Sequence, residues 1–440
     1  MRPHHTPAAR ARRVTSAALL AVVASSSTGC NEILQADAPQ LIEESSLQAP
    51  SNAQVIVAGA VGDFECAFAS YIATMGTVSD EFADAQANAA IWDLDRRTNF
   101  PQTGLYSGAA GVPTNTCTEF GRVYTPVSQA RYQADNALRL LDGWTDQQVP
   151  DRQALIARMA AYAGYSLILL GEGFCSAAID LGPEQTPAQI FGLAEQRFTR
   201  AITVATAVGG ATGDSLRFLA LVGRARARVN QNKLAEAATD AALVPNGFVF
   251  NARYTAAAAR AENRVFRVNN SNGTVTVDPT FRGVTVGTTP DPRVPVADAG
   301  RGGSFPQIRL WVQNKYTSLT SPIPIATWRE ALLIRAEAAA AAGNAAAAVG
   351  FINQLRTAAS LPTYAATDAG AVRAQIPEER RRELFVESHR LYDTIRFNVP
   401  LTPAPGAPFP VGGGTYGNNK CLPLPDIERL NNPSLGPSST

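Results

Sequence analysis

Two helical hairpins in the sequence place the strongest limit on the fold. Apolar residues recur every three to four positions in 214–229 and 233–243, and again in 326–342 and 344–359. This period predicts amphipathic helices, and the short turns between them force each pair to lie antiparallel. Small residues stand where paired helices would meet: Ala225, Ala237 and Ala241 in the first hairpin, and Ala336, Gly343 and Ala347 in the second. We therefore expect a mainly α, tetratricopeptide-like helical repeat scaffold.

Four more helices are expected ahead of these hairpins. The same apolar period marks residues 53–74, 119–143, 149–171 and 187–208. Thr186 is the expected N-cap of the last of these, with Pro187 at its first helical position, and Asp214 is the expected cap of the first hairpin.

The segment between the hairpins, residues 246–325, changes character. Short strand-like runs at 265–268, 274–277 and 284–286 surround Asn272-Gly273, a dipeptide typical of tight hairpin turns. A long non-helical insertion inside a compact protein is usually functional or partner-binding. After residue 399 the chain is again rich in Pro and Gly.

The amino terminus has the layout of an export signal. Arg10, Arg12 and Arg13 precede an apolar run over 14–24, which is too short to span a bilayer, and small residues then lead to Cys30. Gly29-Cys30 resembles a bacterial lipobox, although Ser27 stands where Leu is usual. We expect a signal peptide over 1–29, a lipid anchor on Cys30 and a polar tether over 30–52, with 53–440 as the folded domain. An ordinary signal peptide with an incidental Cys is the alternative.

The charge and the cysteine count limit the possible classes of protein further. The formal charge is +1, and residues 1–29 contribute four Arg and no acid, so the remainder carries −3 and has no basic run suited to nucleic acid. No later stretch has 18 uninterrupted apolar residues, so no other membrane span is expected. Four Cys remain in the exported part, namely Cys66, Cys117, Cys175 and Cys421. They can form disulfides in any of three connectivities, or remain as buried free thiols.

Catalytic and metal motifs are missing from the sequence. Once 1–29 are removed, His389 is the one remaining histidine, so a histidine metal cluster is excluded and neither HExxH nor a P-loop is present. Neither a cofactor nor a metal is expected. A carboxylate cluster over residues 80–95 (Asp80, Glu81, Asp84, Asp93 and Asp95) could support glycoside hydrolysis, but such clusters are more often solvated loops or caps.

Three stretches resemble the SusD/RagB family of outer-membrane nutrient-uptake lipoproteins. The first is Pro322-Ile323-Pro324 with the 330–338 helix, Gly343-Asn344, Ile352-Asn353, Arg356 and Leu361-Pro362. The second is 376–396, IPEERRRELFVESHRLYDTIR, in which Ser388 replaces the usual Gly and Thr394 the usual Leu. The third is 421–425 with Glu428 and Asn432-Pro433, and Asp291-Pro292-Arg293 is a smaller match. On the residues alone, the helix expected over 378–396 is a structural element held by ion pairs, with His389 packed or hydrogen-bonded.

The resemblance implies about four helix pairs and a lipid-anchored receptor on the exterior of the outer membrane. Family members deliver an oligosaccharide or a peptide to a SusC-like, TonB-dependent transporter, without catalysis. Ligand capture would need flat aromatic faces and amide donors. The candidates are Trp92, Tyr106 and Asn115 in the first irregular stretch, and Trp311 and Tyr316 in the insertion; Trp328 is excluded as a helix core residue.

Two other classes remain open at this point. A lipid-anchored helical-repeat scaffold for envelope protein assembly would need no ligand site. A surface glycosidase would need two carboxylates placed roughly 5–10 Å apart in a cleft.

Overall fold

The structure is a computed structural model that describes residues 48–101 and 117–435. The predicted signal peptide, Cys30, most of the tether, Tyr106 and Asn115 lie outside these residues. The described chain belongs to one compact unit, Pro50–Thr440.

Long helices dominate the first half of the chain. The elements up to the insertion are η1 (Pro50–Asn52), α3 (Ala53–Val78), β1 (Phe82–Asp84), α4 (Ala89–Asp95), α6 (Tyr124–Gly143), α7 (Arg152–Gly173), β2 (Ala177–Ala178), β3 (Glu184–Gln185), α8 (Pro187–Val208), α9 (Gly210–Asn230) and α10 (Leu234–Ala242).

The insertion and the last helices follow. These elements are β4 (Val249–Ala252), η2 (Ala259–Ala261), α11 (Arg264–Phe266), η3 (Arg267–Ser271), β5 (Val275–Val277), η4 (Pro279–Phe281), β6 (Thr285–Val286), β7 (Thr289–Pro290), β8 (Val296–Gly302), β9 (Arg309–Gln313), β10 (Ile323–Thr327), α12 (Trp328–Ala341), α13 (Ala345–Ala358), α14 (Ala369–Glu383), α15 (Arg390–Arg396) and α16 (Asp426–Asn431).

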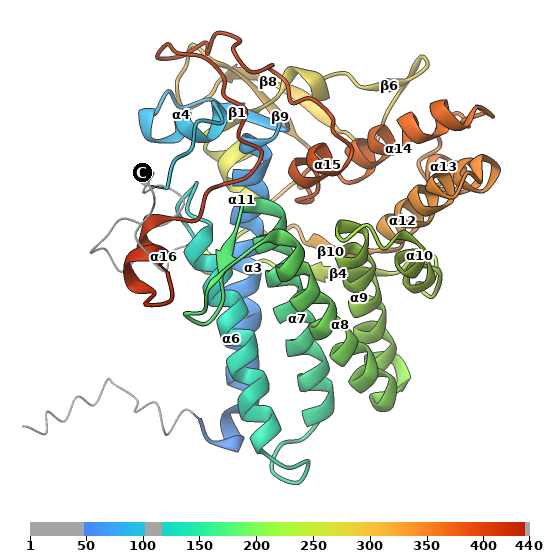
Figure 1. The fold of residues 1–440 in the computed structure, drawn as a ribbon. Coiled ribbons are helices and arrows are strands. Elements are labelled where there is room, and N and C mark those ends of the chain that lie inside the picture. The colour runs from blue at the N-terminus through green and yellow to red at the C-terminus, as the bar shows by residue number, and fades with distance from the viewer. Residues whose placement is uncertain (1–47, 102–116, 436–440) are drawn as a thin grey trace, which may run out of the picture. The chain divides into compact units, whose positions relative to one another are not determined.

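The long helices pack in chain order, each against the next. The pairs are α3 with α6, α7 with α8, α9 with α10 and α12 with α13, and α10 contacts α12 across the insertion. Figure 1 shows α3, α6, α7, α8 and α9 side by side, with α4, β1, β8 and β9 beyond one end of α3. One hydrophobic core runs through these helices into the insertion. The expected mainly α, tetratricopeptide-like scaffold of four helix pairs is confirmed.

Glycines bring the central helices close together. The ring of Phe198 on α8 fills the space beside Gly164 on α7 and Gly223 on α9, where an added Cβ would lie 2.8 Å and 2.3 Å from it. Gly164 and Gly223 therefore let α7 and α9 approach α8 closely, although the sequence analysis did not single them out.

The two predicted hairpins form, with local corrections. Ala225, Ala237 and Ala241 are buried as expected, and so is Ala336. Gly343, however, is exposed, and Ala348 rather than Ala347 takes the buried position. Gly343 has a φ of 78° and ends the turn before Asn344, whose side chain accepts a hydrogen bond from the amide of Ala347.

Helix caps also divide between confirmed and wrong predictions. Thr186 caps α8 in a full capping box with Gln189, with Pro187 in the first turn. Asp214 is not a cap, because α9 already begins at Gly210.

The insertion is built by pairings that are distant in sequence. The predicted strand over 265–268 is wrong: α11 and a π-helical turn occupy it, with the Asn263 side chain accepting from the amide of Phe266. No hairpin forms at Asn272-Gly273 either, because β5 pairs antiparallel with β1. Asn269, fully buried, donates to the carbonyls of Val275 and Trp311 and so holds the helical turn against these strands.

The single helix predicted over 378–396 is also wrong. α14 ends at Glu383 and α15 begins at Arg390. Between them Val386 and Ser388 have φ values of 51° and 72°, a left-handed conformation that favours glycine. Tertiary bonds hold this break: the amide of Val386 donates to Glu81 and its carbonyl accepts from Tyr316. Ser388 therefore takes a conformation that glycine adopts without strain, at the position where the resemblance predicts Gly.

The four cysteines of the described chain form two disulfides. Cys66 pairs with Cys117 and Cys175 pairs with Cys421, with Cα–Cα distances of 5.7 and 5.1 Å. This excludes the free-thiol alternative. The second bond ties the carboxyl-terminal segment to the end of α7, where the amide of Cys175 also donates to the carbonyl of Leu422.

Two helices are long and apolar enough to cross a membrane by length and composition, the one over Pro50–Val78 and the one over Arg152–Gly173. In the second, 89% of the apolar window is buried against the rest of the protein. Both pack within the helix array, as core helices of a folded domain do.

Candidate functional site

A polar cavity lies where the insertion meets the last helix pair. Its volume is about 660 Å³, and its charged lining residues are Arg293, Lys315, Arg329, Glu383 and Glu387. The rest of the lining is Pro292 and Pro295, Pro322 and Pro324 at the start of β10, Asn251 on β4, Tyr316, and residues 358–360 at and just after the end of α13. Three motif stretches of the sequence, distant along the chain, therefore meet at one cavity.

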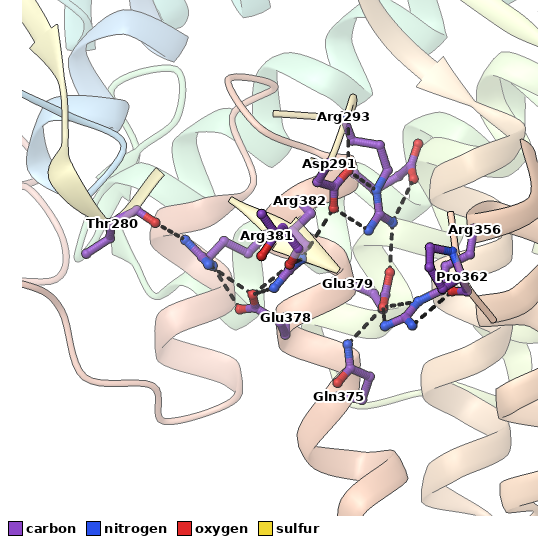
Figure 2. Close-up of polar contacts among 12 residues, drawn as sticks. Thr280, Asp291, Arg293, Arg356, Pro362, Gln375, Glu378, Glu379, Arg381 and Arg382 are labelled. Atoms are coloured by element: carbon purple, nitrogen blue, oxygen red, sulfur yellow. Dashed lines mark hydrogen bonds and ion pairs between the residues drawn. The ribbon is translucent and has the colours of Figure 1, made fainter. Parts of the chain in front are cut away.

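Beneath the cavity, Arg293 is bound on two sides by carboxylates. Its Nε and Nη2 donate to the two oxygens of Asp291 at 2.9 and 2.8 Å, and its Nη1 donates to Glu379 at 2.7 Å (Figure 2). The side chains of Asp291 and Glu379 are fully buried. Although burial opposes the charged form, these carboxylates and Glu383 hold the pKa of Arg293 above its usual value. The motif Asp291-Pro292-Arg293 thus joins the insertion to α14.

The same carboxylate of Glu379 also joins α13 to α14. Arg356 donates its Nε to Glu379 at 2.8 Å, and its Nη1 reaches the carbonyl of Pro362 (Figure 2). Gln375 donates to the same oxygen of Glu379. Three elements converge on one buried carboxylate, so this network fixes the floor of the cavity.

Lys315 forms one wall of the cavity by capping a helix end. Its Nζ donates to the carbonyls of Glu383 and Phe385 at 3.2 and 3.0 Å, and pairs with Glu387 at 2.7 Å. An ammonium has three donors, and all three are used here. Glu383 is buried, and burial raises its pKa despite the nearby charges of Arg293, Arg329 and Lys315.

The predicted aromatic residues take separate places in the structure. Trp92 on α4 packs against Phe409 and Arg96, and its ring edge lies against Gly412, where an added Cβ would be 2.0 Å away. Trp311 on β9 has the guanidinium of Arg282 5.0 Å from its ring centre. Both are partly buried, so a role for either in ligand contact stays a prediction.

Tyr316 is the predicted residue that reaches the cavity, but it does so from the core. It is 2% exposed, and its hydroxyl donates to the carbonyl of Val386 at 3.1 Å. Tyr316 therefore packs in the core at the edge of the cavity, and its contact with a ligand stays a prediction. Trp328, excluded at the outset, is partly buried against the core.

The sequence suggested that the carboxylate cluster of residues 80–95 is a solvated loop or a set of helix caps. The structure shows instead that most of its side chains are buried. Asp80, Glu81, Asp84 and Asp95 are all buried. Each has a structural partner: Asp80 binds Arg390 through both oxygens, and Asp95 accepts from the amide of Asp84 at 2.7 Å. Among the described residues no group of three or more His, Cys, Asp or Glu side chains is placed to hold a metal ion.

The side chains of the motif at 376–396 form ion pairs inside the protein, as the sequence pattern predicted. Arg380 pairs with Asp393 at 2.8 Å, and His389 lies 3.1 Å from Glu330 on α12. Glu330 is buried, yet His389, Arg226 and Arg380 keep its pKa below the usual value.

Sequence reasoning missed the charged lining of the cavity. Arg293, Lys315 and Glu383 were treated as isolated or structural residues, and Arg329 and Asn251 were not singled out. A usable signal existed, because each of the motif stretches at 291–293, 322–324 and 376–396 contributes two residues to the lining.

Burial of the carboxylates predicts how stability depends on pH. Burial raises the pKa of Glu81 and of Asp95 to about 7. An acid with a raised pKa binds its proton more tightly in the folded state, so it stabilises the fold at low pH and this stability is lost as pH rises through about 7. Glu195 and Asp393 have the opposite effect on stability, because their pKa values are lowered to about 2. They stabilise the fold at neutral pH, and this stability is lost as pH falls through about 4 towards 2.

We therefore expect the melting temperature to rise as pH falls from about 8 to about 5, and to fall again below about pH 4. Glu81→Gln and Asp95→Asn should each flatten the first limb, which thermal denaturation across this range would measure. Asp298→Asn, at an exposed ion pair with Arg309, is the control and should leave the slope unchanged. A flat or inverted limb in the parent protein would contradict the assignment.

The fold can now be compared with known proteins. The protein has a helical-repeat fold, and its last helix pair meets the irregular insertion of residues 246–325 at a polar cavity. The model of the SusD family matches residues 286–420. This range supplies all of the cavity lining except Asn251. A sequence search of curated proteins found no match.

Solved structures share the fold over most of the chain. A SusD superfamily protein from Bacteroides vulgatus ATCC 8482 aligns with a TM-score of 0.68 and 14% identity, covering 88% of this chain and 98% of that one. A SusD-like carbohydrate binding protein from the same organism aligns at 0.65 and 15%, covering 88% and 97%. A laminarin binding SusD-like protein aligns at 0.61 and 17%, covering 88% and 98%.

The predicted resemblance is confirmed over residues 286–420, which match the SusD family model, and the chain shares its fold with SusD-like structures. The scaffold alternative is not favoured by these comparisons, because similar structures are described as carbohydrate-binding or laminarin-binding proteins.

Proposed function

We propose that this protein is a non-catalytic receptor that binds an oligosaccharide and delivers it to a TonB-dependent, SusC-like transporter in the outer membrane. The observation that carries the proposal is the cavity, because its lining comes almost entirely from the part of the chain that matches the SusD family model. The solved structures described as carbohydrate-binding support a saccharide over a peptide.

The receptor binds and releases its ligand without changing it. The buried carboxylates of the 80–95 cluster are engaged by Arg390 and by backbone amides, and none of them lines the cavity. The energy for moving the ligand across the outer membrane then comes from the TonB-dependent transporter.

Ligand binding is tested with the chain from residue 31, which retains the whole compact unit Pro50–Thr440. It is screened by calorimetry against oligosaccharides and peptides, and each ligand found is incubated with the protein and checked for cleavage. We expect binding of a saccharide that remains intact. Binding of peptides alone, or turnover of a glycan, would refute the proposal.

The predicted aromatic contacts are tested in the same assay. Trp92→Ala and Trp311→Ala are compared with Trp144→Ala, at the carboxyl end of α6. We expect a loss of affinity of about three- to tenfold for a tryptophan that stacks on the ligand. If neither substitution weakens any ligand found, these two residues are not part of the site.

The membrane anchor is tested separately. Metabolic labelling with a fatty-acid probe should mark the parent protein and not Cys30→Ser. Protease treatment of intact cells should degrade the labelled protein if it faces the exterior, and copurification should recover a TonB-dependent transporter. An unlabelled parent protein would remove the lipoprotein assignment.

A further inference from the structure

Near the carboxyl terminus, residues 406–416 form a short antiparallel hairpin. Tyr416 exchanges backbone hydrogen bonds with Gly406 and Ala407, at 2.8 and 2.9 Å. The rings of Phe409 and Tyr416 are buried and pack edge to face, with their centres 5.3 Å apart. The base of this hairpin is therefore held firmly by its own bonds and by its two buried rings.

The tip of the hairpin, residues 410–414, is held much more weakly. Its three glycines, 412–414, are exposed and have consecutive left-handed φ values of 69°, 78° and 83°. Among the described residues, one hydrogen bond reaches the tip from outside the hairpin: Arg96 donates its Nη1 to the carbonyl of Gly413 at 3.4 Å, near the outer limit for such a bond. A segment with so few bonds can open while the rest of the fold stays intact.

The tip lies on Trp92 of α4. An added Cβ at Gly412 would be 2.0 Å from the six-membered ring of the indole, so no side chain fits between them. The guanidinium carbon of Arg96 is 6.0 Å from the centre of the same indole. Because α4 is anchored by the buried side chains of Ile91 and Leu94, separation of the two moves the exposed tip rather than the tryptophan.

The tip contacts Trp92 and Arg96 in the way that a sugar ring would. A pyranose presents C–H groups to an aromatic ring and oxygen atoms to hydrogen-bond donors. Here Gly412 supplies the apolar contact with the indole, and the carbonyl oxygen of Gly413 accepts from the guanidinium. Opening of the tip exposes both groups at once, beside the ring of Phe409, whose centre is 6.2 Å from that of Trp92.

From this arrangement we infer that the tip is a self-inhibitory lid, which occupies the place of a saccharide on Trp92 and Arg96 and moves aside when a saccharide binds there. The inference rests on the proposed function, and it adds how access to one of the predicted contact residues is regulated. Because the closed tip competes with the ligand, the apparent affinity is reduced in proportion to the fraction of molecules that are open.

Two glycine substitutions separate the lid contact from backbone strain. In Gly412→Ala the new methyl group has no room beside Trp92, so the tip must lift. Gly413→Ala is the matched control, because it places alanine in the same left-handed conformation but has no atom within 4 Å of the new Cβ. A difference between the two variants therefore reports on the contact with the indole.

The first measurement is the accessibility of Trp92 in the chain from residue 31. Acrylamide quenching of tryptophan fluorescence is recorded for the parent and both glycine variants, each with and without Trp92→Phe, so that the difference isolates this one indole. We expect a larger quenching constant for Trp92 in Gly412→Ala than in Gly413→Ala. Thermal denaturation checks that each variant folds.

The second measurement is saccharide affinity. Laminarin, cellulose and amylose oligosaccharides are titrated by calorimetry against the same proteins. We expect Gly412→Ala to bind at least one of them about two- to tenfold more tightly than Gly413→Ala, and Trp92→Ala to remove this gain. If Gly412→Ala does not fold, a variant in which Asn-Gly replaces residues 410–413 shortens the hairpin to a two-residue turn and should show the same gain.

The outcomes separate the lid from the receptor function. Equal quenching of Trp92 in the two glycine variants overturns the lid. A rise in quenching without a gain in affinity, or a gain that survives Trp92→Ala, overturns it as well, and in each of these cases saccharide binding by the parent keeps the receptor function. If no saccharide binds the parent or any variant, both proposals are wrong.

Discussion

Replacing Arg293 by methionine is expected to lower the free energy of unfolding by about 3–5 kcal/mol, the cost typical of breaking a buried ion pair. The change leaves Asp291 and Glu379 charged, fully buried and without their shared guanidinium. Methionine keeps most of the side-chain volume, so the loss reports on charge rather than on a cavity. Denaturant unfolding of the two proteins at about pH 7 measures it.

The control for this variant is an exposed ion pair of similar geometry. Arg309→Met breaks the pair with Asp298, whose side chains are 55% and 37% exposed, and should cost less than about 1 kcal/mol. A third variant, Arg293→Met combined with Asp291→Asn, removes the carboxylate that loses two of its bonds to Arg293 and should recover part of the loss. If Arg293→Met and Arg309→Met cause equally small losses of stability, the buried ion pairs of Arg293 with Asp291 and Glu379 do not stabilise the fold.

The substitution Gly223→Ala is expected to destabilise the protein by about 1–3 kcal/mol, in spite of the better helix propensity of alanine. The new methyl group would lie 2.3 Å from the ring of Phe198, which also touches Gly164 on the opposite helix. The ring cannot move away without losing its contacts with α7. Thermal and denaturant unfolding measure the effect.

Gly350→Ala provides the opposite case. Gly350 lies inside α13 with no atom within 4 Å of the position of a new Cβ, so alanine should stabilise the protein by up to about 1 kcal/mol. Gly223→Ala combined with Phe198→Leu should be more stable than Gly223→Ala alone, because the smaller side chain makes room. If Gly223→Ala stabilised the fold as Gly350→Ala does, close helix approach at Phe198 would be disproved.

Local sequence patterns were sufficient to predict the long helices of the first half of the chain. The period of apolar residues predicted α3, α6, α7 and α8 to within a few residues, and Thr186 with Pro187 marked the start of α8. These features depend on residues within one or two turns of each other, and the sequence displays such separations directly.

The candidate site shows where local patterns stop being sufficient. Trp92 and Trp311 were chosen because aromatic residues in loops suit sugar binding, but nothing in the sequence tells that Gly412 and Arg282 pack against them. Conversely, Arg329 was an ordinary residue of a helix until the structure placed it at the mouth of the cavity.

The sequence by itself determined the helical-repeat architecture, the resemblance to the SusD family and the ion-pairing role of the motif around Glu379. Only the tertiary structure decided that β1 pairs with β5, that the 378–396 segment breaks at Val386–Ser388, and that Arg329 lies in the cavity lining beside Glu383. The physical reason is distance along the chain. Helix signals operate over about four residues, whereas these features depend on partners far away in sequence, such as Glu81 beneath Val386.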